Sequence, residues 1–125
     1  MEKPAKSILV IDDDPQFRDY MLDLLEENHF RVFLADNGDS GLKKFTIHTP
    51  DLVITDIVMP DKEGVEFIHN VRMADSTVPI IAVSGGFRGD TYSYLHMAKK
   101  LGANATLGKP FTADEIFTMI DDLLA

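Results

Sequence analysis

The chain has 125 residues, 45% of them hydrophobic and 26% charged, as is usual for one soluble globular domain. Its formal net charge of −9 disfavours direct nucleic-acid binding, which needs clustered Lys and Arg. The absence of cysteine excludes disulfides, thiolate nucleophiles and Cys-based zinc sites. No apolar run approaches the roughly 20 residues of a membrane-spanning helix, and residues 1–7 do not resemble a signal peptide. We therefore expect a cytoplasmic protein with no membrane association.

The first predicted strand is the apolar run Ser7-Ile-Leu-Val-Ile11, which ends in three consecutive aspartates. The third of these, Asp14, precedes Pro15, a pair typical of a helix N-cap with proline at the first helical position. Apolar side chains then recur at helical spacing: Phe17, Tyr20, Met21, Leu24 and Leu25. We expect this helix to end near Asn28.

A second strand and a short helix are expected before Pro50. The run Arg31-Val-Phe-Leu-Ala35 is bounded by polar residues, which favours a strand at the edge of a sheet. Asn37-Gly-Asp-Ser40 indicates a turn and a helix start.

The third predicted strand lies in the stretch Asp51-Leu-Val-Ile-Thr-Asp56-Ile-Val-Met-Pro60. Its apolar residues are rich in β-branched side chains and bounded by breakers, a pattern typical of a buried strand. Asp56 follows at the carboxyl end, where ligands bind in open parallel α/β sheets. A helix is expected after residues 61–64, with one apolar face formed by Val65, Ile68 and Val71.

Two further strand–helix units are predicted in the last part of the chain. Pro79 opens a strand at residues 80–83, and a helix near residues 94–101 is expected to end at Gly102. Residues 104–108 form a weaker fifth strand. Thr112 and Glu115 have the spacing of a capping box, and the helix they open has an apolar stripe: Ile116, Met119, Ile120 and Leu123.

Strand and helix alternate five times, which predicts an α/β domain with a parallel sheet covered by helices on both faces. The first, third and fourth strands are nearly all apolar, as central strands of such a sheet must be. No internal repeat or linker interrupts the pattern, so residues 1–125 are expected to form a single domain.

Polar residues follow four of the five predicted strands, and parallel strands bring their carboxyl ends to one edge. Asp12 and Asp13 follow the first strand, Asp56 the third and Ser84 the fourth, while Lys109 lies one loop residue beyond the fifth. Three neighbouring carboxylates repel one another, and a hard divalent cation such as Mg²⁺ relieves that repulsion with oxygen ligands.

The remaining side chains at this edge complete a phosphoryl-transfer site. Lys109 would neutralise charge on the transferred group, Ser84 would donate a hydrogen bond to it, and Asp56 would be the covalent acceptor. Singly, such residues are more often a helix cap, a solvated lysine and a turn serine. Their coincidence at one edge favours a phosphoacceptor.

These motifs resemble the receiver domain of two-component response regulators, of the chemotaxis-regulator type, over essentially the whole chain. The matching segments, in chain order, are Ile8–Asp14, Asp51–Pro60, Ile81–Ser84, Gly102-Ala103 and Lys109-Pro110-Phe111. The resemblance implies a flavodoxin-like (βα)5 doubly wound sheet of five parallel strands in the order 2-1-3-4-5. It also implies that the Lys109–Pro110 peptide bond is cis.

The resemblance further implies a role in phosphorelay signalling. Asp56 would take a phosphoryl group from a phosphohistidine of a sensor histidine kinase or of a histidine phosphotransfer protein. Mg²⁺ or Mn²⁺ would be held by Asp13 and Asp56 directly, by Asp12 mainly through water, and by the backbone carbonyl of Val58. Phosphoryl oxygens would be bound by Ser84, Lys109 and two backbone amides, those of Ile57 and Gly85. The protein would be a regulator that promotes its own phosphorylation and dephosphorylation, not an enzyme acting on other substrates.

Three positions depart from the family pattern. Thr106 stands where members usually carry an aromatic switch residue, so either the signal uses another packing change or Thr106 is simply an exposed strand residue. Val58 and Gly86 replace polar side chains common beside the site, so hydrolysis of the aspartyl phosphate would lack help from either. The glycine-containing connection after Ser84 either folds over the site or is only a flexible loop before the fourth helix.

Two other functions occur on the same topology, but each needs residues that this chain lacks. An aspartate-nucleophile phosphatase would need a second acid two residues after Asp56, where this chain has Val58. A flavin- or nucleotide-binding module would need a phosphate-cradling loop after the first strand, where this chain has three aspartates. The switch is expected to act on a downstream protein through the face formed by the fourth helix, fifth strand and fifth helix. The same face could instead serve dimerisation on phosphorylation or kinase docking. The sequence also does not decide between a stand-alone regulator and part of a longer protein.

Overall fold

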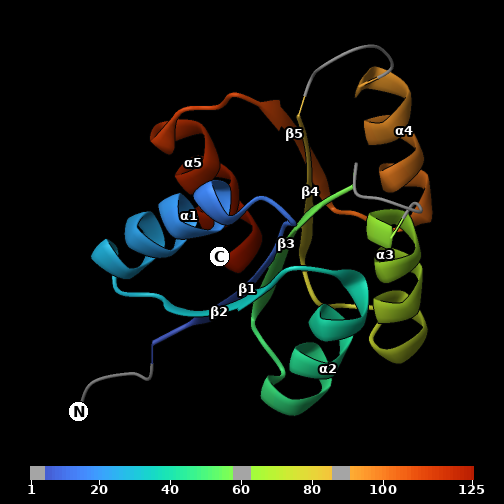
Figure 1. Cartoon of the computed structure of the whole chain (residues 1–125), viewed down its shortest axis with the longest axis horizontal. Coiled ribbons are helices and arrows are strands. Elements are labelled where there is room, and N and C mark those ends of the chain that lie inside the picture. Colours follow the sequence, from blue (N-terminus) through green and yellow to red (C-terminus); the bar gives the residue numbers. More distant parts are fainter. Residues whose placement is uncertain (1–4, 58–62, 86–90) are drawn as a thin grey trace.

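Five strands and five helices alternate along the chain in the computed structural model, which describes residues 5–57, 63–85 and 91–125 (Figure 1). The strands are β1 Ser7–Ile11, β2 Arg31–Ala35, β3 Leu52–Asp56, β4 Ile80–Gly85 and β5 Ala105–Lys109. The helices are α1 Pro15–Glu27, α2 Gly38–His48, α3 Glu63–Ala74, α4 Thr91–Leu101 and α5 Ala113–Leu124. All strand pairs are parallel and the order is β2-β1-β3-β4-β5, so the predicted flavodoxin-like topology is confirmed.

Local sequence signals set the helix starts. The Asp14 side chain accepts a hydrogen bond from the Gln16 amide at 3.0 Å, and Pro15 occupies the first turn of α1, as predicted. Asn37 caps α2 through the Ser40 amide at 2.8 Å. In α5 the Thr112 and Glu115 side chains each bond the other residue's amide, forming the predicted capping box.

Helices cover both faces of the sheet. Figure 1 shows α1 and α5 on one face and α2, α3 and α4 on the other. Because successive strand residues point to opposite faces, β1 sends Ile8 and Val10 toward the first group and Leu9 and Ile11 toward the second. Each fully buried aliphatic side chain contributes roughly 1.5–3 kcal/mol of transfer free energy. The sheet that carries the site is therefore held on both sides.

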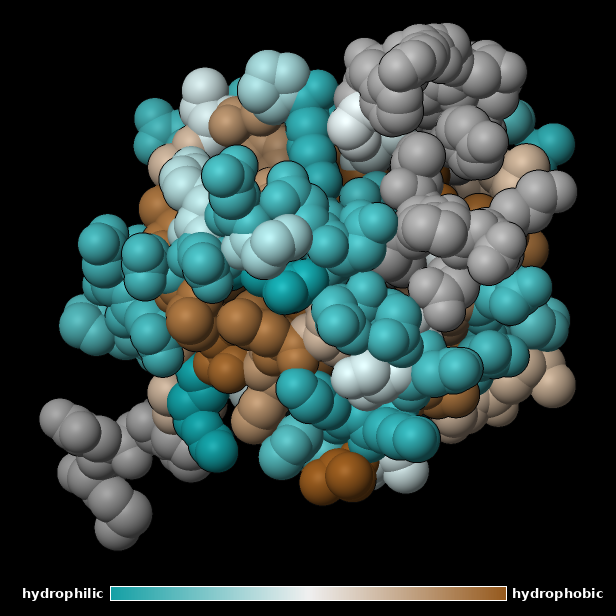
Figure 2. Space-filling model, in the orientation of Figure 1, coloured by the Kyte–Doolittle hydropathy of each residue, from teal (hydrophilic) through white to brown (hydrophobic). Residues whose placement is uncertain are grey.

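Burial separates the central strands from the edges. Every residue of β1 and β3 is buried, as are the first five residues of β4, whereas β2 and β5 are half-exposed along most of their length. The prediction that residues 31–35 form an edge strand is confirmed by the sheet order. Figure 2 shows the apolar surface that accompanies this edge, a brown patch beside β2 between α1 and α2.

Two sequence expectations need correction. The buried face of α3 contains Phe67, with 1% of its surface exposed, next to Ile68 and Val71, while the expected core residue Val65 is only half-buried. The cause is rotation of the helix, which turns Gly64 and Phe67 toward the sheet. The fourth and fifth strands also run further than expected, to Gly85 and Lys109, so Ser84 and Lys109 are strand residues and do not follow the strands.

A side-chain brace joins α3 to the connection between α4 and β5. The Arg72 guanidinium donates to the Gly102 carbonyl at 3.0 Å and to the Asn104 side-chain oxygen at 2.8 Å, and the latter also accepts from the Ile80 amide at 2.8 Å. Gly102 has φ +123°, a conformation that favours glycine, as predicted for a helix end. Within the described ranges, no helix is long and apolar enough to cross a membrane.

Candidate phosphoacceptor site

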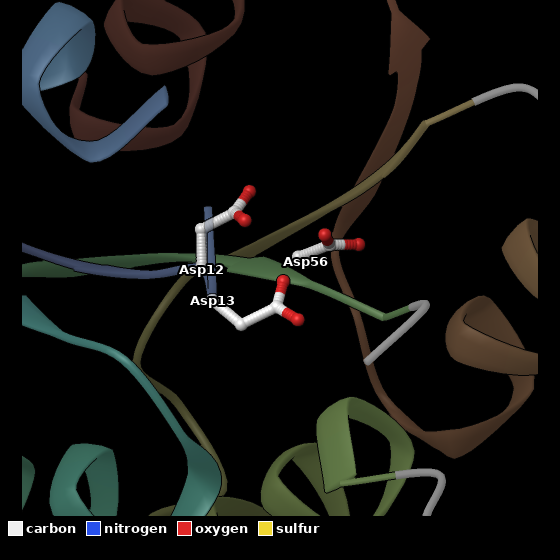
Figure 3. Close-up of side chains that lie close together, drawn as sticks. All are labelled: Asp12, Asp13 and Asp56. Atoms are coloured by element: carbon white, nitrogen blue, oxygen red, sulfur yellow. The ribbon is translucent and has the colours of Figure 1, made fainter. Parts of the chain in front are cut away.

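Three aspartates converge at the carboxyl edge of the sheet (Figure 3). Asp12 and Asp13 directly follow β1, and Asp56 ends β3, the neighbouring strand. Each offers one carboxylate oxygen, and the three oxygens lie within 4.8 Å of one another. Asp12 and Asp56 are 0% and 5% exposed, whereas Asp13 is open to solvent. Such an all-oxygen donor set, with one side open to water, fits a hard divalent cation.

Backbone and side-chain hydrogen bonds fix Asp12 in place. Its carboxylate accepts from the Asp14 amide at 2.9 Å, and its own amide donates to the Ala35 carbonyl at 3.1 Å. Its carbonyl accepts from the Arg18 guanidinium at 2.7 Å. The turn after β1 therefore holds this buried carboxylate and begins α1 at the same time.

Lys109 brings a positive charge to the carboxylates. Its Nζ lies 2.6 Å from Oδ2 of Asp12 and 3.5 Å from Oδ2 of Asp56. The Lys109 side chain is 19% exposed, so these ion pairs are partly shielded from water. The Lys109–Pro110 bond is cis, as the family resemblance implied.

Ser84 places a hydroxyl at the same edge. It lies on β4, in register with Gly108 of β5, and is fully buried. Among the described residues, its Oγ has no hydrogen-bond partner. Burying a hydroxyl without a hydrogen-bond partner destabilises a protein by roughly 1–3 kcal/mol. The Ser84 Oγ is therefore suited to bind an oxygen of a ligand at the site.

The backbone groups that were expected to bind phosphoryl oxygens or the metal have different surroundings in the structure. The Ile57 amide, expected to bind a phosphoryl oxygen, here donates to the Val83 carbonyl at 3.0 Å. Gly85, the other expected amide, closes β4 opposite Lys109, whose Cδ lies 3.9 Å from a Cβ built on Gly85. Val58, whose carbonyl was expected to bind the metal, lies outside the described residues, as does Gly86.

Three residues contribute to the site although the sequence did not predict it: Gly64, Phe17 and Arg18. Gly64 packs so closely that a Cβ built on it would lie 2.3 Å from the Asp56 carbonyl oxygen. Phe17 places its ring 3.9 Å from the Lys109 Nζ, and Arg18 donates to Asp12 as described above. Phe17 was recognised only as a member of an apolar stripe, and contacts between segments so far apart in sequence leave no periodic signal.

An apolar pocket of about 280 Å³ adjoins the lysine, lined by Phe17, Tyr20, Lys109, Pro110 and Phe111. On β5, Thr106 is half-buried and in register with Ala82 of β4. This is where the family pattern would place an aromatic switch residue.

Comparison with known proteins agrees with this geometry. The family described as "Response regulator receiver domain" matches residues 8–121. The chemotaxis protein CheY of Bacillus subtilis is 33% identical over 121 residues, which cover 96% of this chain and 98% of that protein. A receiver domain structure from Clostridium thermocellum superimposes with a TM-score of 0.87 at 30% identity, covering 95% and 94% of the two chains.

The relatives differ in length. CheY proteins are matched over nearly their whole length. The KDP operon transcriptional regulatory protein KdpE of Escherichia coli is 34% identical over 110 residues. That match covers 88% of this chain but only 47% of KdpE. The structure of the chemotaxis response regulator CheY4 of Vibrio cholerae, 25% identical, has a TM-score of 0.85 and covers 96% of this chain and 99% of that one. The chain thus belongs to the response regulator receiver domain family of two-component signalling.

Proposed function

We propose that Asp56 is the phosphoacceptor of a two-component phosphorelay. The observation that carries this proposal is the convergence, at one sheet edge, of a nearly buried carboxylate with two more acids, an ammonium and a buried hydroxyl. The phosphoryl group comes from a phosphohistidine on a sensor histidine kinase or a histidine phosphotransfer protein. An Asp56 oxygen attacks phosphorus as the N–P bond breaks, and the departing imidazole takes up a proton.

Mg²⁺, or Mn²⁺, fits the acidic cluster. The three carboxylates supply hard oxygen ligands on one side, and the exposure of Asp13 leaves the other side open to water or phosphate oxygen. We expect Asp13, Asp56 and the Val58 carbonyl to bind the ion directly and Asp12 mainly through water. When bound, the ion supplies positive charge that offsets the negative charge of the carboxylates and of the incoming phosphoryl group.

The chain's own groups complete the site. The Lys109 ammonium, 3.5 Å from Asp56, neutralises phosphoryl oxygens. The Ser84 hydroxyl gains a hydrogen-bond acceptor when a phosphoryl oxygen arrives, and the Gly85 amide donates beside it. The Ile57 amide would have to leave the Val83 carbonyl to join them.

The signal is expected to leave through the face formed by α4, β5 and α5, where a downstream protein reads the phosphorylated state. Phosphorylation shifts the population between two conformations of this face. With Thr106 in the usual aromatic position, we assign the shift to packing changes other than inward rotation of a ring. Dimerisation through the same face would be a second way to read the state. We take residues 1–125 as one receiver domain acting in the cytoplasm, as a regulator without nucleic-acid or membrane binding of its own.

Incubation with Mg²⁺ and acetyl phosphate tests the assignment. Intact-mass spectrometry should show the gain of one phosphoryl group, and Asp56→Asn should abolish it. Asp51→Asn is the matched control, because Asp51 flanks the other end of β3, where its carboxylate accepts from the Ser7 amide at 2.8 Å.

The outcomes separate the candidate functions. Labelling that persists in Asp56→Asn would overturn the site. Continuous turnover of phosphate esters without a trapped adduct would favour the aspartate-nucleophile phosphatase instead. Retained labelling in Asp51→Asn would show that the loss in Asp56→Asn is specific to the carboxyl edge.

A further inference from the structure

The ring of Phe17 faces the side-chain ammonium of Lys109. The Nζ lies 3.9 Å from the ring centroid, well inside the roughly 6 Å reach of a cation–π interaction. The same ring meets Phe111 edge to face, with centroids 6.0 Å apart and planes at 86°. The ammonium thus contacts a carboxylate, Asp12, and an aromatic face together.

Both rings are held by the ends of helices. Phe17 lies in the first turn of α1, which Asp14 caps and Pro15 opens. Phe111 directly precedes Thr112, whose capping box with Glu115 begins α5. The position of the Phe17 ring is therefore fixed by the same turn that holds Asp12.

We propose that Phe17 is a positioning residue for Lys109. This inference rests on the proposed phosphoacceptor function. It adds that Phe17 helps to hold the Lys109 ammonium where the phosphoryl group will bind. Lysine has a long side chain whose immobilisation is entropically costly. The ring face attracts the ammonium and limits its motion, so that it stays within 3.5 Å of Asp56 before the phosphoryl group arrives.

The ring does something that an aliphatic side chain of similar size cannot do. Leucine would keep an apolar wall beside Lys109, but it has no quadrupole to attract a cation. Asp12 alone draws the ammonium toward its own oxygen, at 2.6 Å, and away from Asp56. The ring adds a third contact, so the position of the ammonium is determined by Asp12, Asp56 and Phe17 together.

Three variants at this position test the role. Phe17→Leu should lower the rate of labelling by acetyl phosphate, and the affinity for beryllofluoride in the presence of Mg²⁺, by about threefold to tenfold, as expected for a partly shielded cation–π pair. Phe17→Tyr keeps the ring face and should restore most of both. Phe30→Leu is the matched control, because Phe30, like Phe17, is a half-buried ring that packs against the buried residues between the sheet and helices α1 and α5. It should leave both values unchanged.

A double-mutant cycle separates positioning from packing. If Phe17 acts through Lys109, adding Phe17→Leu to Lys109→Met should cause no further loss. A further loss equal to that in the wild-type background would show that the ring acts only through packing, and would overturn the inference. Equal labelling of Phe17→Leu and the wild type would overturn it as well.

A spectroscopic measurement reads the contact without any phosphodonor. Protons on the Lys109 methylene next to Nζ should resonate upfield in NMR spectra because of the Phe17 ring current, and Phe17→Leu should remove that shift. Absence of the shift in the wild type overturns the inference even if Asp56 is phosphorylated. Presence of the shift together with failure of the wild type to be labelled would instead overturn the proposed function, and the catalytic meaning of the contact with it.

Discussion

Removing the Ser84 hydroxyl should stabilise the unphosphorylated protein while weakening its response to phosphorylation. Ser84 is fully buried, and its Oγ has no hydrogen-bond partner among the described residues. A buried hydroxyl in that situation carries a desolvation penalty of about 1–3 kcal/mol, which Ser84→Ala would relieve. The same hydroxyl is our proposed donor to a phosphoryl oxygen, so its loss should be felt only once that oxygen is present.

The expected magnitudes have opposite signs. Without Mg²⁺ or phosphodonor, Ser84→Ala should raise the free energy of unfolding by about 1 kcal/mol, the lower end of that penalty. For a domain of this size the gain corresponds to roughly 3–6 °C in Tm. A hydrogen bond to a charged acceptor contributes about 1.5–3 kcal/mol, so the affinity for beryllofluoride should fall by roughly tenfold to a hundredfold.

Urea denaturation followed by circular dichroism measures the first effect, and a beryllofluoride titration measures the second. Thr55→Val is the matched control, because the Thr55 hydroxyl is equally buried but donates to the Asp56 carbonyl at 3.0 Å. Its loss should destabilise the protein by about 1 kcal/mol. If Ser84→Ala proved as destabilising as Thr55→Val, the Ser84 hydroxyl would already have a partner in the unphosphorylated protein, and the reasoning would be refuted.

Three further changes test the scaffold of the domain, one of them beside the site. Gly64→Ala would place a Cβ 2.3 Å from the Asp56 carbonyl oxygen, so it should destabilise the domain by about 1–3 kcal/mol in urea denaturation and lower Mg²⁺ affinity measured by calorimetry. Gly102→Ala combines φ +123° with a contact of 2.8 Å to Arg72 Cγ and should lower the free energy of unfolding by about 1–3 kcal/mol, without affecting Mg²⁺ binding. Hydrogen bonds from Thr77 lower the pKa of Asp75 below its usual value, so the ionised carboxylate favours the folded state. Asp75→Ala should therefore lower the free energy of unfolding at neutral pH. The loss should shrink as the pH falls below about 4, the ordinary pKa of an aspartate, toward the lower pKa of the folded-state carboxylate; a constant difference across pH 2–7 would contradict this.

The order of the elements was readable from the chain because each element signals its own type locally. The three nearly apolar runs at residues 7–11, 52–55 and 80–83 can only be central strands of a two-faced sheet. Caps such as Asp14 with Pro15, and Thr112 with Glu115, fix helix starts through hydrogen bonds between residues two or three positions apart. Such short-range signals survive in the sequence alone.

Predictions that depended on how a whole element is rotated or extended were less accurate. Val65 was expected in the core beside Ile68 and Val71, but α3 turns Phe67 inward instead. The spacing allows either rotation, and the close approach of Gly64 to the backbone of Asp56 and Ile57 selects one. Pairing with β4 likewise extends β5 to include Lys109.

By itself, the sequence determined the α/β class, the chain order of the elements and the set of polar residues that parallel topology delivers to one edge. Only the tertiary structure decided how those residues meet. It places Lys109 closer to Asp12 than to Asp56, leaves the Ser84 hydroxyl buried at the same edge of the sheet, and sets the Phe17 ring against the ammonium. The reason is physical: spacing along a chain encodes which face or edge a residue occupies, but distances between side chains of separate elements are set by packing of the whole domain.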